Sequence, residues 1–254
     1  PVDVPEPPGP DAAPFYAPIG DFQGELYRRN AFALATGAEI EALVARLGLG
    51  PGMRLLDVGC GNGRHLRALA GRGVAGVGVD ISAGLVEAAR AAAEADGLTG
   101  VSFVVGDARA LGDLEEVAEG SFDVAMALCQ GGFGTSPASD PAVVAGLARA
   151  VRPGGAVVLT AFSALFAARH LTPGDAFDPV DLVHHQTSEV RGPDGAVRRF
   201  DLWTAAYTVR DLRRLVTDAG LQLVSVDGAE PGRYGATGIR LDDPELLVVA
   251  RRPM

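Results

Sequence analysis

The stretch Leu55-Leu56-Asp57-Val58-Gly59-Cys60-Gly61-Asn62-Gly63-Arg64-His65 decides the fold. An apolar run of strand length leads into three alternating glycines, and a segment with helical periodicity follows. Glycine has no Cβ, so a ligand can lie directly against the backbone of such a turn. In open α/β sheets this kind of turn lies at the carboxyl ends of the strands, where nucleotide-type ligands bind. The stretch therefore predicts a ligand-binding turn between a strand over 54–58 and a helix over 64–70.

Short apolar runs and helix-period segments alternate along the chain on both sides of this stretch. This alternation predicts an α/β fold with a doubly wound, mostly parallel sheet of seven strands. Ser82 and Thr208 are expected to cap two of the helices, with Asp211 as the capping-box partner of Thr208. The strands are expected at 54–58, 76–80, 101–105, 122–128, 156–162, 221–226 and 246–250, and the helices at 64–70, 83–95, 142–151 and 209–219.

The remaining segments predict one domain with an arm and an insertion. Residues 1–20 are rich in proline and are expected to form a flexible arm, and residues 21–254 a single domain. Within that domain we expect N-terminal helices over 21–49, divided near Gly37, a ligand-binding half over 50–162, and a C-terminal helix and strands over 208–254.

Residues 163–207 interrupt the alternation and are expected to form a lid. Gly192-Pro193-Asp194-Gly195 suits a type I turn, so a β-hairpin is expected after the fifth strand. The segment leaves from the edge where ligands bind, and its aromatic residues argue against disorder. A dimerisation hairpin is the alternative interpretation.

Composition excludes several classes of function. The net charge is −10 and no dense arginine run occurs, which disfavours a nucleic acid as partner. All 22 basic residues are arginine, so this sequence has no lysine for a Schiff base or a phosphate-binding loop. No apolar run approaches the roughly 20 residues of a membrane span, and no signal sequence opens the chain. Cys60 and Cys129 have no framework spacing, so we expect a reduced, cytoplasmic protein.

A dinucleotide-binding turn is the competing interpretation of the glycines. Its G-x-G-x-x-G/A pattern, started at Gly59, requires a small residue where this chain has Arg64. The acidic Asp57 directly before the glycines does not fit that pattern either.

The glycine turn resembles the first motif of the class I S-adenosylmethionine-dependent methyltransferases, D/E-x-G-x-G-x-G. Asp57, Gly59, Gly61 and Gly63 match it completely, and the resemblance is specific over about residues 50–162. It implies a Rossmann-like fold, S-adenosyl-L-methionine as the cofactor, and methyl transfer to an O, N or C atom of a small-molecule acceptor.

The resemblance also implies roles for individual residues. Asp80 ends the second strand, where the family's carboxylate binds the two ribose hydroxyls, and Asp107 lies where the family contacts the adenine amino group. Taken alone, either aspartate would be an ordinary turn residue, and Cys60 a small packing residue. The residues expected to contact the cofactor are Asp57, Gly59, Cys60, Gly61, Asp80, Ile81, Gly106, Asp107, Ala108, Leu128, Cys129, Gln130 and Tyr27.

The acceptor site is expected beside the segment 128–134 and under the insertion. The segment lacks the N/D-P-P-Y/F pattern that family members acting on amino groups of bases or amides often carry. His184 and His185 are the candidate catalytic residues; adjacent histidines diverge on a strand, and no metal site is expected. The residues expected to bind the acceptor are Tyr16, Phe133, Arg169 and His170.

Two alternatives to methyl transfer stay open at this point. One is an enzyme of the same fold that uses the bound cofactor electrostatically without transferring its methyl group. The other is a catalytically silent cofactor-binding protein. The sequence names neither the acceptor nor the oligomeric state, which is expected to be a monomer or a homodimer.

Overall fold

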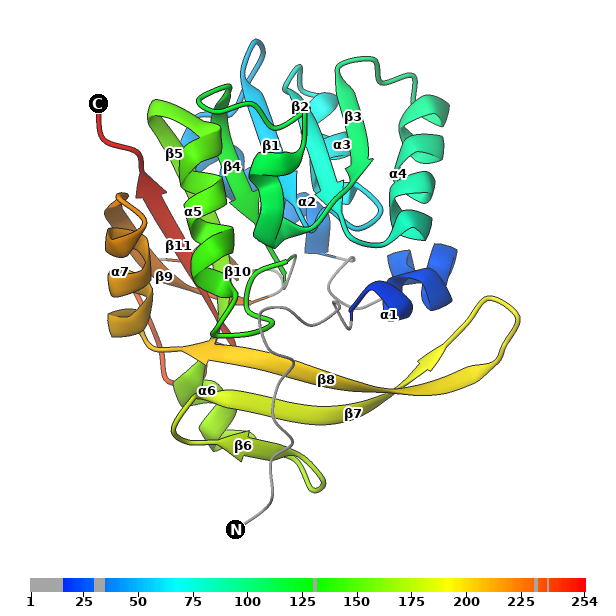
Figure 1. The fold of residues 1–254 in the computed structure, drawn as a ribbon, viewed down its shortest axis with the longest axis vertical. Helices are drawn as coiled ribbons and strands as arrows, with labels where there is room; N and C mark the ends of the chain where they lie inside the picture. The colour runs from blue at the N-terminus through cyan, green and yellow to red at the C-terminus, as the bar shows by residue number, and fades with distance from the viewer. Residues whose placement is uncertain (1–15, 30–34, 130–131, 231–232, 237) are drawn as a thin grey trace.

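Five adjacent parallel strands form the larger part of one open sheet in the computed structural model (Figure 1). The structure describes residues 16–29, 35–129, 132–230, 233–236 and 238–254. The strand order β10-β9-β11-β5-β4-β1-β2-β3 starts from β1 and extends outward in both directions, which confirms the doubly wound fold. The parallel strands are β1 (Arg54–Val58), β2 (Ala75–Asp80), β3 (Val101–Val105), β4 (Phe122–Ala127) and β5 (Val151–Ser163). The antiparallel strands beyond β5 are β11 (Glu245–Arg251), β9 (Gln222–Glu230) and β10 (Arg233–Ala236).

Helices cover both faces of the sheet. One face carries α2 (Thr36–Leu47), α3 (Arg64–Ala70) and α4 (Ala83–Ala95), and the other carries α5 (Asp140–Ala150) and α7 (Val209–Asp218). The central strands are therefore buried on both sides, which explains their nearly continuous apolar sequences. No helix in the described part of the chain combines the length and the apolar character that crossing a membrane requires.

The carboxyl ends of the parallel strands meet at one edge of the sheet. Val58 of β1 lies beside Val79 of β2, and Asp57 lies beside Met126 of β4. The glycine turn after β1, Asp80 at the end of β2 and the loop after β4 therefore leave the sheet next to one another.

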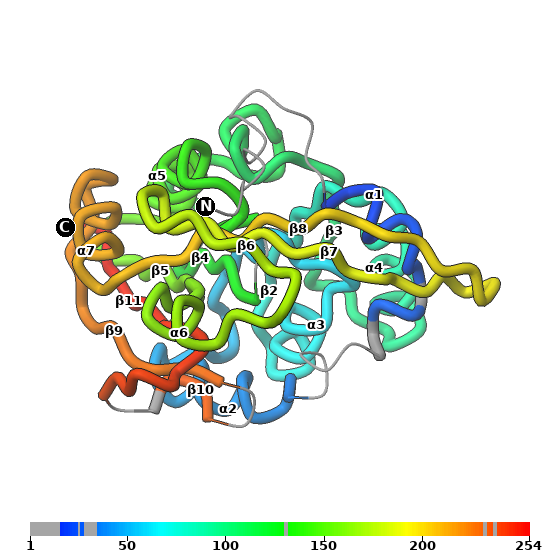
Figure 2. Tube along the Cα trace, turned by 90° about the horizontal axis from the view of Figure 1, so that it is seen from below, coloured from blue at the N-terminus to red at the C-terminus, as the bar shows by residue number. Residues whose placement is uncertain are grey.

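A long hairpin crosses this edge, as Figures 1 and 2 show. Its strand β7 (Val183–Arg191) pairs along its whole length with β8 (Val197–Tyr207), and the base of β8 joins the end of β5 through Ala206 and Phe162. A turn closed by the amide of Gly195 and the carbonyl of Gly192 at 3.0 Å connects the strands, as predicted. The short elements around the hairpin are α1 (Tyr16–Gln23), the 3-10 helix η1 (Gly24–Arg29), α6 (Ala164–Arg169) and β6 (Ala176–Asp178).

The structure corrects several predicted boundaries. α1 begins at Tyr16, so the last residues of the expected arm are helical, and the arm's first 15 residues lie outside the described part. Gly37 lies inside the first turn of α2 and does not divide a helix. Within the described residues the main path has eight strands, not seven, because β10 pairs with β9. β5 begins at Val151, since a register irregularity opposite Phe122 lets the expected turn join the strand.

Both predicted helix caps are confirmed. The Ser82 hydroxyl accepts from the amide of Leu85 at 3.2 Å, and Thr208 and Asp211 form the full capping box. A second short 3-10 helix, η3 (Ala108–Asp113), was not predicted and follows β3.

Asp140 fastens the base of the hairpin to α5. Its carboxylate is fully buried and accepts hydrogen bonds from the Tyr207 hydroxyl and, at 3.0 Å, from the Gly134 amide. Burial raises the pKa of Asp140 to about 7 against the opposing effect of these donors. Tyr207 in turn stacks on Phe133, with 5.4 Å between ring centroids.

We expect Tyr207→Phe to lower the free energy of unfolding by about 1–3 kcal/mol, because it removes a donor from a buried carboxylate. Tyr234→Phe is the matched control: its buried hydroxyl has no hydrogen-bond partner among the described residues, so its removal should leave the free energy of unfolding unchanged or raise it. Urea unfolding of both variants without ligand measures the difference. Equal losses would show that the Tyr207–Asp140 bond does not stabilise the fold.

Candidate functional site

The glycine turn has a backbone that only glycine adopts easily. Gly59, Gly61 and Gly63 have φ angles of 68°, 55° and 72°, in the left-handed region. The amides of Gly59 and Cys60 donate to the carbonyl of Val79 at 2.7 and 3.0 Å, which fixes the turn against the end of β2.

Gly61 and Gly63 also make room for a neighbour. A Cβ on Gly61 would lie 2.9 Å from the ring of Tyr27, and one on Gly63 would lie 2.5 Å from the ring of Phe103. Gly63 thus serves packing, whereas Gly61 faces the side where a ligand would lie. Cys60 is 5% exposed and packs in the core beside Phe103, so only its backbone faces the turn.

Asp80 is held in place by backbone amides. Its Oδ2 accepts from Gly61 at 2.7 Å and its Oδ1 from Ser82 at 2.9 Å. Burial raises the pKa of Asp80, and these two hydrogen bonds act in the opposite direction. Because each carboxylate oxygen has a second lone pair, the oriented group can still accept from two hydroxyls.

The Asp107 carboxylate makes hydrogen bonds within the protein that the sequence did not predict. It accepts from the backbone amide of Arg109 at 2.9 Å, and the Arg109 guanidinium contacts both of its oxygens. Burial raises the pKa of Asp107, but the hydrogen bonds and the charge of Arg109 outweigh it and leave the pKa lowered. Gly106 and Ala108 flank this aspartate, and a Cβ on Gly132 would come within 2.7 Å of Ala108. The loops after β3 and β4 therefore touch.

Two buried oxygens at the glycine turn have no hydrogen-bond partner among the described residues: Asp57 Oδ2 and Asn62 Oδ1. Burial raises the pKa of Asp57 to about 7, against the attraction of Arg64. A buried acceptor that makes no hydrogen bond costs roughly 1–3 kcal/mol, so the site suits a ligand that carries hydrogen-bond donors. The amino group and ribose hydroxyls of S-adenosylmethionine are donors of this kind, and the residues present fit that cofactor.

Two tyrosines from the N-terminal helices lie at the edge. Tyr27 lies against Gly61, and burial, with a smaller effect of the Asp80 charge, raises its pKa. Tyr16 makes a hydrogen bond with Thr204 of β8, and burial raises its pKa as well. The helices α1 and η1 therefore connect the hairpin to the glycine turn.

Cys129 marks the end of β4 with a strained backbone. Its φ of 54° is rare for a residue other than glycine, and its amide donates to Thr160 Oγ1 at 2.7 Å. Strain of this kind occurs preferentially at functional sites.

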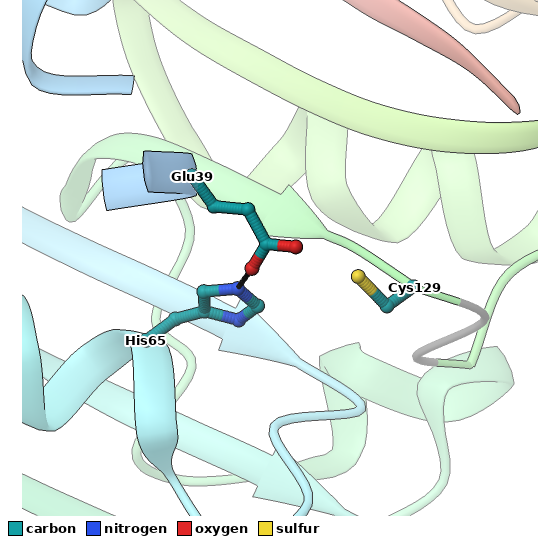
Figure 3. A group of neighbouring side chains, drawn as sticks. All are labelled: Glu39, His65 and Cys129. Atoms are coloured by element: carbon teal, nitrogen blue, oxygen red, sulfur yellow. Dashed lines mark hydrogen bonds and ion pairs between the residues drawn. The ribbon is translucent and has the colours of Figure 1, made fainter. Parts of the chain in front are cut away.

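Glu39, His65 and Cys129 lie close together, as Figure 3 shows. His65 Nε2 lies 2.8 Å from Glu39 Oε2, and the Arg64 guanidinium contacts both Glu39, at 2.6 Å, and Cys129 Sγ, at 3.2 Å. Arg64 thus already supplies the positive charge that this group attracts. Burial also raises the pKa of the Cys129 thiol, which disfavours the thiolate that a metal would bind. We assign this cluster to an ion-pair network and not to a metal site.

The predicted acceptor residues do not all meet. Phe133 is 1% exposed and packs in the core under Tyr207. Arg169 and His170 lie at the exposed end of α6, where both contact Asp242. Gln130 lies outside the described residues.

His184 and His185 project from opposite faces of the hairpin. His184 lies opposite Thr204 in the β7–β8 ladder, so the two side chains share one face of the hairpin. Phe200 is on the same face of β8, because side chains alternate along a strand, and Phe22 of α1 packs against it. His185 lies on the other face, 5.0 Å from the Trp203 ring. Each has an aspartate partner at 3.0 Å: Asp175 for His184 and Asp201 for His185.

Sequence reasoning missed the polar residues that line the edge from α2, β10 and β11. They are Glu39, Tyr234 and Glu245, and none of them belongs to a recognisable motif. A charged residue at the first position of an apolar strand, as Glu245 is, was the one available signal.

Comparisons with known proteins agree with this geometry. Residues 55–155 match the family model described as "Methyltransferase domain". The chain is 35% identical over 167 residues to malonyl-[acyl-carrier protein] O-methyltransferase of Serratia marcescens, covering 61% of this chain and 59% of that protein. It is 40% identical over 134 residues to nocamycin O-methyltransferase of Saccharothrix syringae, covering 50% and 45%.

Residues 55–155 are a class I S-adenosylmethionine-dependent methyltransferase domain.

Solved structures extend the likeness of this methyltransferase domain to most of the chain. The CcbJ methyltransferase from Streptomyces caelestis superposes with a TM-score of 0.73 at 20% identity, over 93% of this chain and 98% of that one. An S-adenosylmethionine-dependent methyltransferase from Clostridium acetobutylicum gives a TM-score of 0.68 at 14% identity, over 91% and 97%. At these identities the likeness concerns the fold. The matched regions span about half the length of the curated relatives, between 45% and 59%.

We expect Asp80→Ala to weaken the binding of S-adenosylmethionine at least tenfold, because two charge-assisted hydrogen bonds are lost at about 1.5–3 kcal/mol each. Calorimetry measures the affinity. Asp96→Ala is the matched control, since Asp96 contacts only Arg67 in the hydrogen bonds and ion pairs of the described residues and lies far along α4 from the turn. An unchanged affinity in Asp80→Ala would remove Asp80 from the cofactor site.

Proposed function

We propose that the protein transfers a methyl group from S-adenosylmethionine to a small-molecule acceptor at the carboxyl edge of the sheet. The observation that carries this proposal is the glycine turn, where an oriented carboxylate lies beside a complete family motif, with two buried oxygens that have no partner in the described part of the chain. The names of two relatives contain "O-methyltransferase", which favours an oxygen nucleophile as the acceptor.

The cofactor would extend along the edge from β3 to β4. Asp80 would accept from the ribose hydroxyls, with Ile81 beside it, and Asp107 would contact the adenine amino group from between Gly106 and Ala108. Since Arg109 holds both oxygens of Asp107, adenine binding has to share or displace that contact.

The methionine part of the cofactor would lie toward Leu128, Cys129 and Gln130. Asp57 Oδ2 is the acceptor available to its amino group, and Tyr27 would cover Gly61 from above. When bound, the cofactor supplies an activated methyl group on a cationic sulfur. The protein then contributes alignment of the acceptor, which can be worth roughly 7–11 kcal/mol, and exclusion of water.

The hairpin and α1 would form the cover of the acceptor site. Tyr16 of α1 is hydrogen-bonded to Thr204, and Thr204 lies opposite His184 on the same face of the hairpin. This face is the one that α1 covers. Asp175 accepts from Thr172 and pairs with His184, which fixes the orientation of the imidazole. We assign acceptor contact to His184 and Tyr16, and give His185, on the opposite face, a supporting place beside Trp203.

We also propose a cytoplasmic location and a monomer or homodimer. Cys60 and Cys129 are both free cysteines, as a reducing compartment favours. The net charge of −10 argues against a nucleic acid as the acceptor.

The experiment that tests the function is formation of S-adenosylhomocysteine from S-adenosylmethionine with small phenols and carboxylic acids as probe acceptors. A product that depends on the acceptor supports methyl transfer. Tight cofactor binding without S-adenosylhomocysteine for any probe would favour the electrostatic or silent alternative. Greater thermal stabilisation by NAD than by S-adenosylmethionine would overturn the cofactor assignment.

We expect His184→Ala to lower kcat/KM about tenfold or more through one lost acceptor contact, with the affinity for S-adenosylmethionine unchanged. His185→Ala is the matched control from the same strand and should retain kcat/KM within about twofold. Steady-state kinetics and calorimetry on both variants decide between the roles. Equal losses in the two variants, or a change of oligomeric state with kcat/KM retained, would make the hairpin a structural or interface element.

A further inference from the structure

Glu245 places a carboxylate at the edge that the cofactor site occupies. It is the first residue of β11 and lies opposite Phe162, where β5 reaches its carboxyl end. The other neighbour of Phe162 is Ala206 of β8, so Glu245 is separated from the base of the hairpin by β5 alone. The β11 strand is antiparallel to β5, which is why its beginning reaches this edge.

Thr160 connects Glu245 to the strained end of β4. The Thr160 hydroxyl is hydrogen-bonded to the Glu245 carboxylate, and it accepts a hydrogen bond from the amide of Cys129 at 2.7 Å. Glu245 is close enough to Cys129 for its charge to help burial raise the pKa of the thiol. The carboxylate is therefore held beside the residue where the family delivers the methyl group.

Tyr234 provides the independent observation that a ligand belongs here. The side chain is 8% exposed, and its hydroxyl has no hydrogen-bond partner among the described residues. Cys129 and Glu245 both act electrostatically on this hydroxyl. An unpartnered buried hydroxyl costs roughly 1–3 kcal/mol, which a ligand with a polar group can recover.

We propose that Glu245 is the general base of the methyl transfer and that Tyr234 holds the acceptor's nucleophilic atom beside it. This inference rests on the proposed function and assigns to that site a class of acceptor: one whose nucleophile carries a proton, such as a phenol or an alcohol.

The proposed step balances in atoms and in charge. The acceptor oxygen forms a bond to the methyl carbon while the bond between that carbon and the cofactor sulfur breaks, and the sulfonium becomes a neutral thioether. The acceptor's O–H proton passes to the Glu245 carboxylate, from which solvent removes it. A base placed in this way contributes about 10²–10⁴ in rate.

The surroundings of Glu245 suit this task. Burial, with the charge of Glu39 as a smaller contribution, raises its pKa to about 7, against the Thr160 hydrogen bond and the charge of Arg64. A base is most effective when its pKa is near the working pH. The charged and titratable groups around it are Glu39 from α2, Arg64 from α3, Cys129 after β4 and Tyr234 from β10. Of the two carboxylates in this group, Glu39 is already bound by Arg64 and His65, so Glu245 is the one that can take a proton.

The first test needs no acceptor turnover. In protein labelled with ¹³C at the glutamate carboxyls, with S-adenosylhomocysteine bound, the signal absent from Glu245→Gln identifies Glu245. We expect it to titrate near pH 7 and to shift when phenol, the probe acceptor, is added. A carboxyl that titrates below about pH 5, or that does not respond to saturating phenol, would overturn the proposal.

The second test uses the probe acceptor that gives the most S-adenosylhomocysteine. The rate of wild-type protein should rise with pH up to about 7, because the base must be ionised. Glu245→Gln should lower kcat at least 100-fold and lose this rise, with cofactor affinity within twofold of wild type. Tyr234→Phe should raise KM and keep the pH profile.

Two control variants distinguish Glu245 from other residues that could act as the base. Glu87→Gln removes an exposed carboxylate on α4 and should change nothing, and His184→Ala should keep the rise toward pH 7. Loss of that rise in His184→Ala but not in Glu245→Gln would assign the proton to the hairpin and overturn the inference. A wild-type protein that forms no S-adenosylhomocysteine with any probe contradicts the proposed function itself, and the carboxyl titration then decides the assignment of Glu245.

Discussion

The hydrogen bond from the Gly61 amide to the Asp80 carboxylate is the constraint on which the edge of the sheet depends. This bond, 2.7 Å long, joins the turn after β1 to the end of β2. One partner has a backbone conformation that is rare outside glycine, and the other is in an environment that is rare for a carboxylate. Gly61 has a left-handed backbone, and Asp80 is a carboxylate at 9% exposure. A buried carboxylate is stable only with donors around it, so the turn has to keep its shape for the charge to be tolerated. The same shape exposes the backbone to a ligand.

Burial and charge are balanced differently on the two sides of this turn. Asp57, Asp140 and Glu245 have pKa values raised to about 7 by burial, whereas Glu39 remains low because His65 and Arg64 both bind it. Arg64 is central to this difference, since its guanidinium contacts Glu39 and Cys129 together. Asp57 and Glu245 feel the charge of Arg64 without an ion pair to it, and burial leaves their pKa values near neutral pH. The edge therefore carries two kinds of acidic group. Glu39 is fixed in an ion pair with Arg64 and holds neighbouring side chains in place, whereas the buried carboxyls with a pKa near 7 can exchange a proton.

Much of the fold could be predicted because its signals are local. The strand over 54–58, the helix over 83–95 and the caps at Ser82 and Thr208 each follow from periodicity or from a side chain next to its own helix. The site's polar network could not be predicted in this way. Glu39, Tyr234 and Glu245 meet only through α2 packing on β10 and through the β5–β11 ladder, at separations of many tens of residues. Phe133 was expected at the acceptor for its position after β4, but stacking on Tyr207 takes it into the core.

Cys129 is held by contacts from β5 and from α3. Thr160 of β5 is in turn hydrogen-bonded to the carboxylate of Glu245 at the start of β11. The amide of Cys129 is bonded to Thr160 and its thiol to Arg64, so its φ of 54° is held from both ends. A strained residue persists only when its surroundings determine it more firmly than its own preferences do. The strain at Cys129 therefore shows how strongly the structure fixes this one point, and direct displacement at a methyl carbon gains from fixed alignment of this kind.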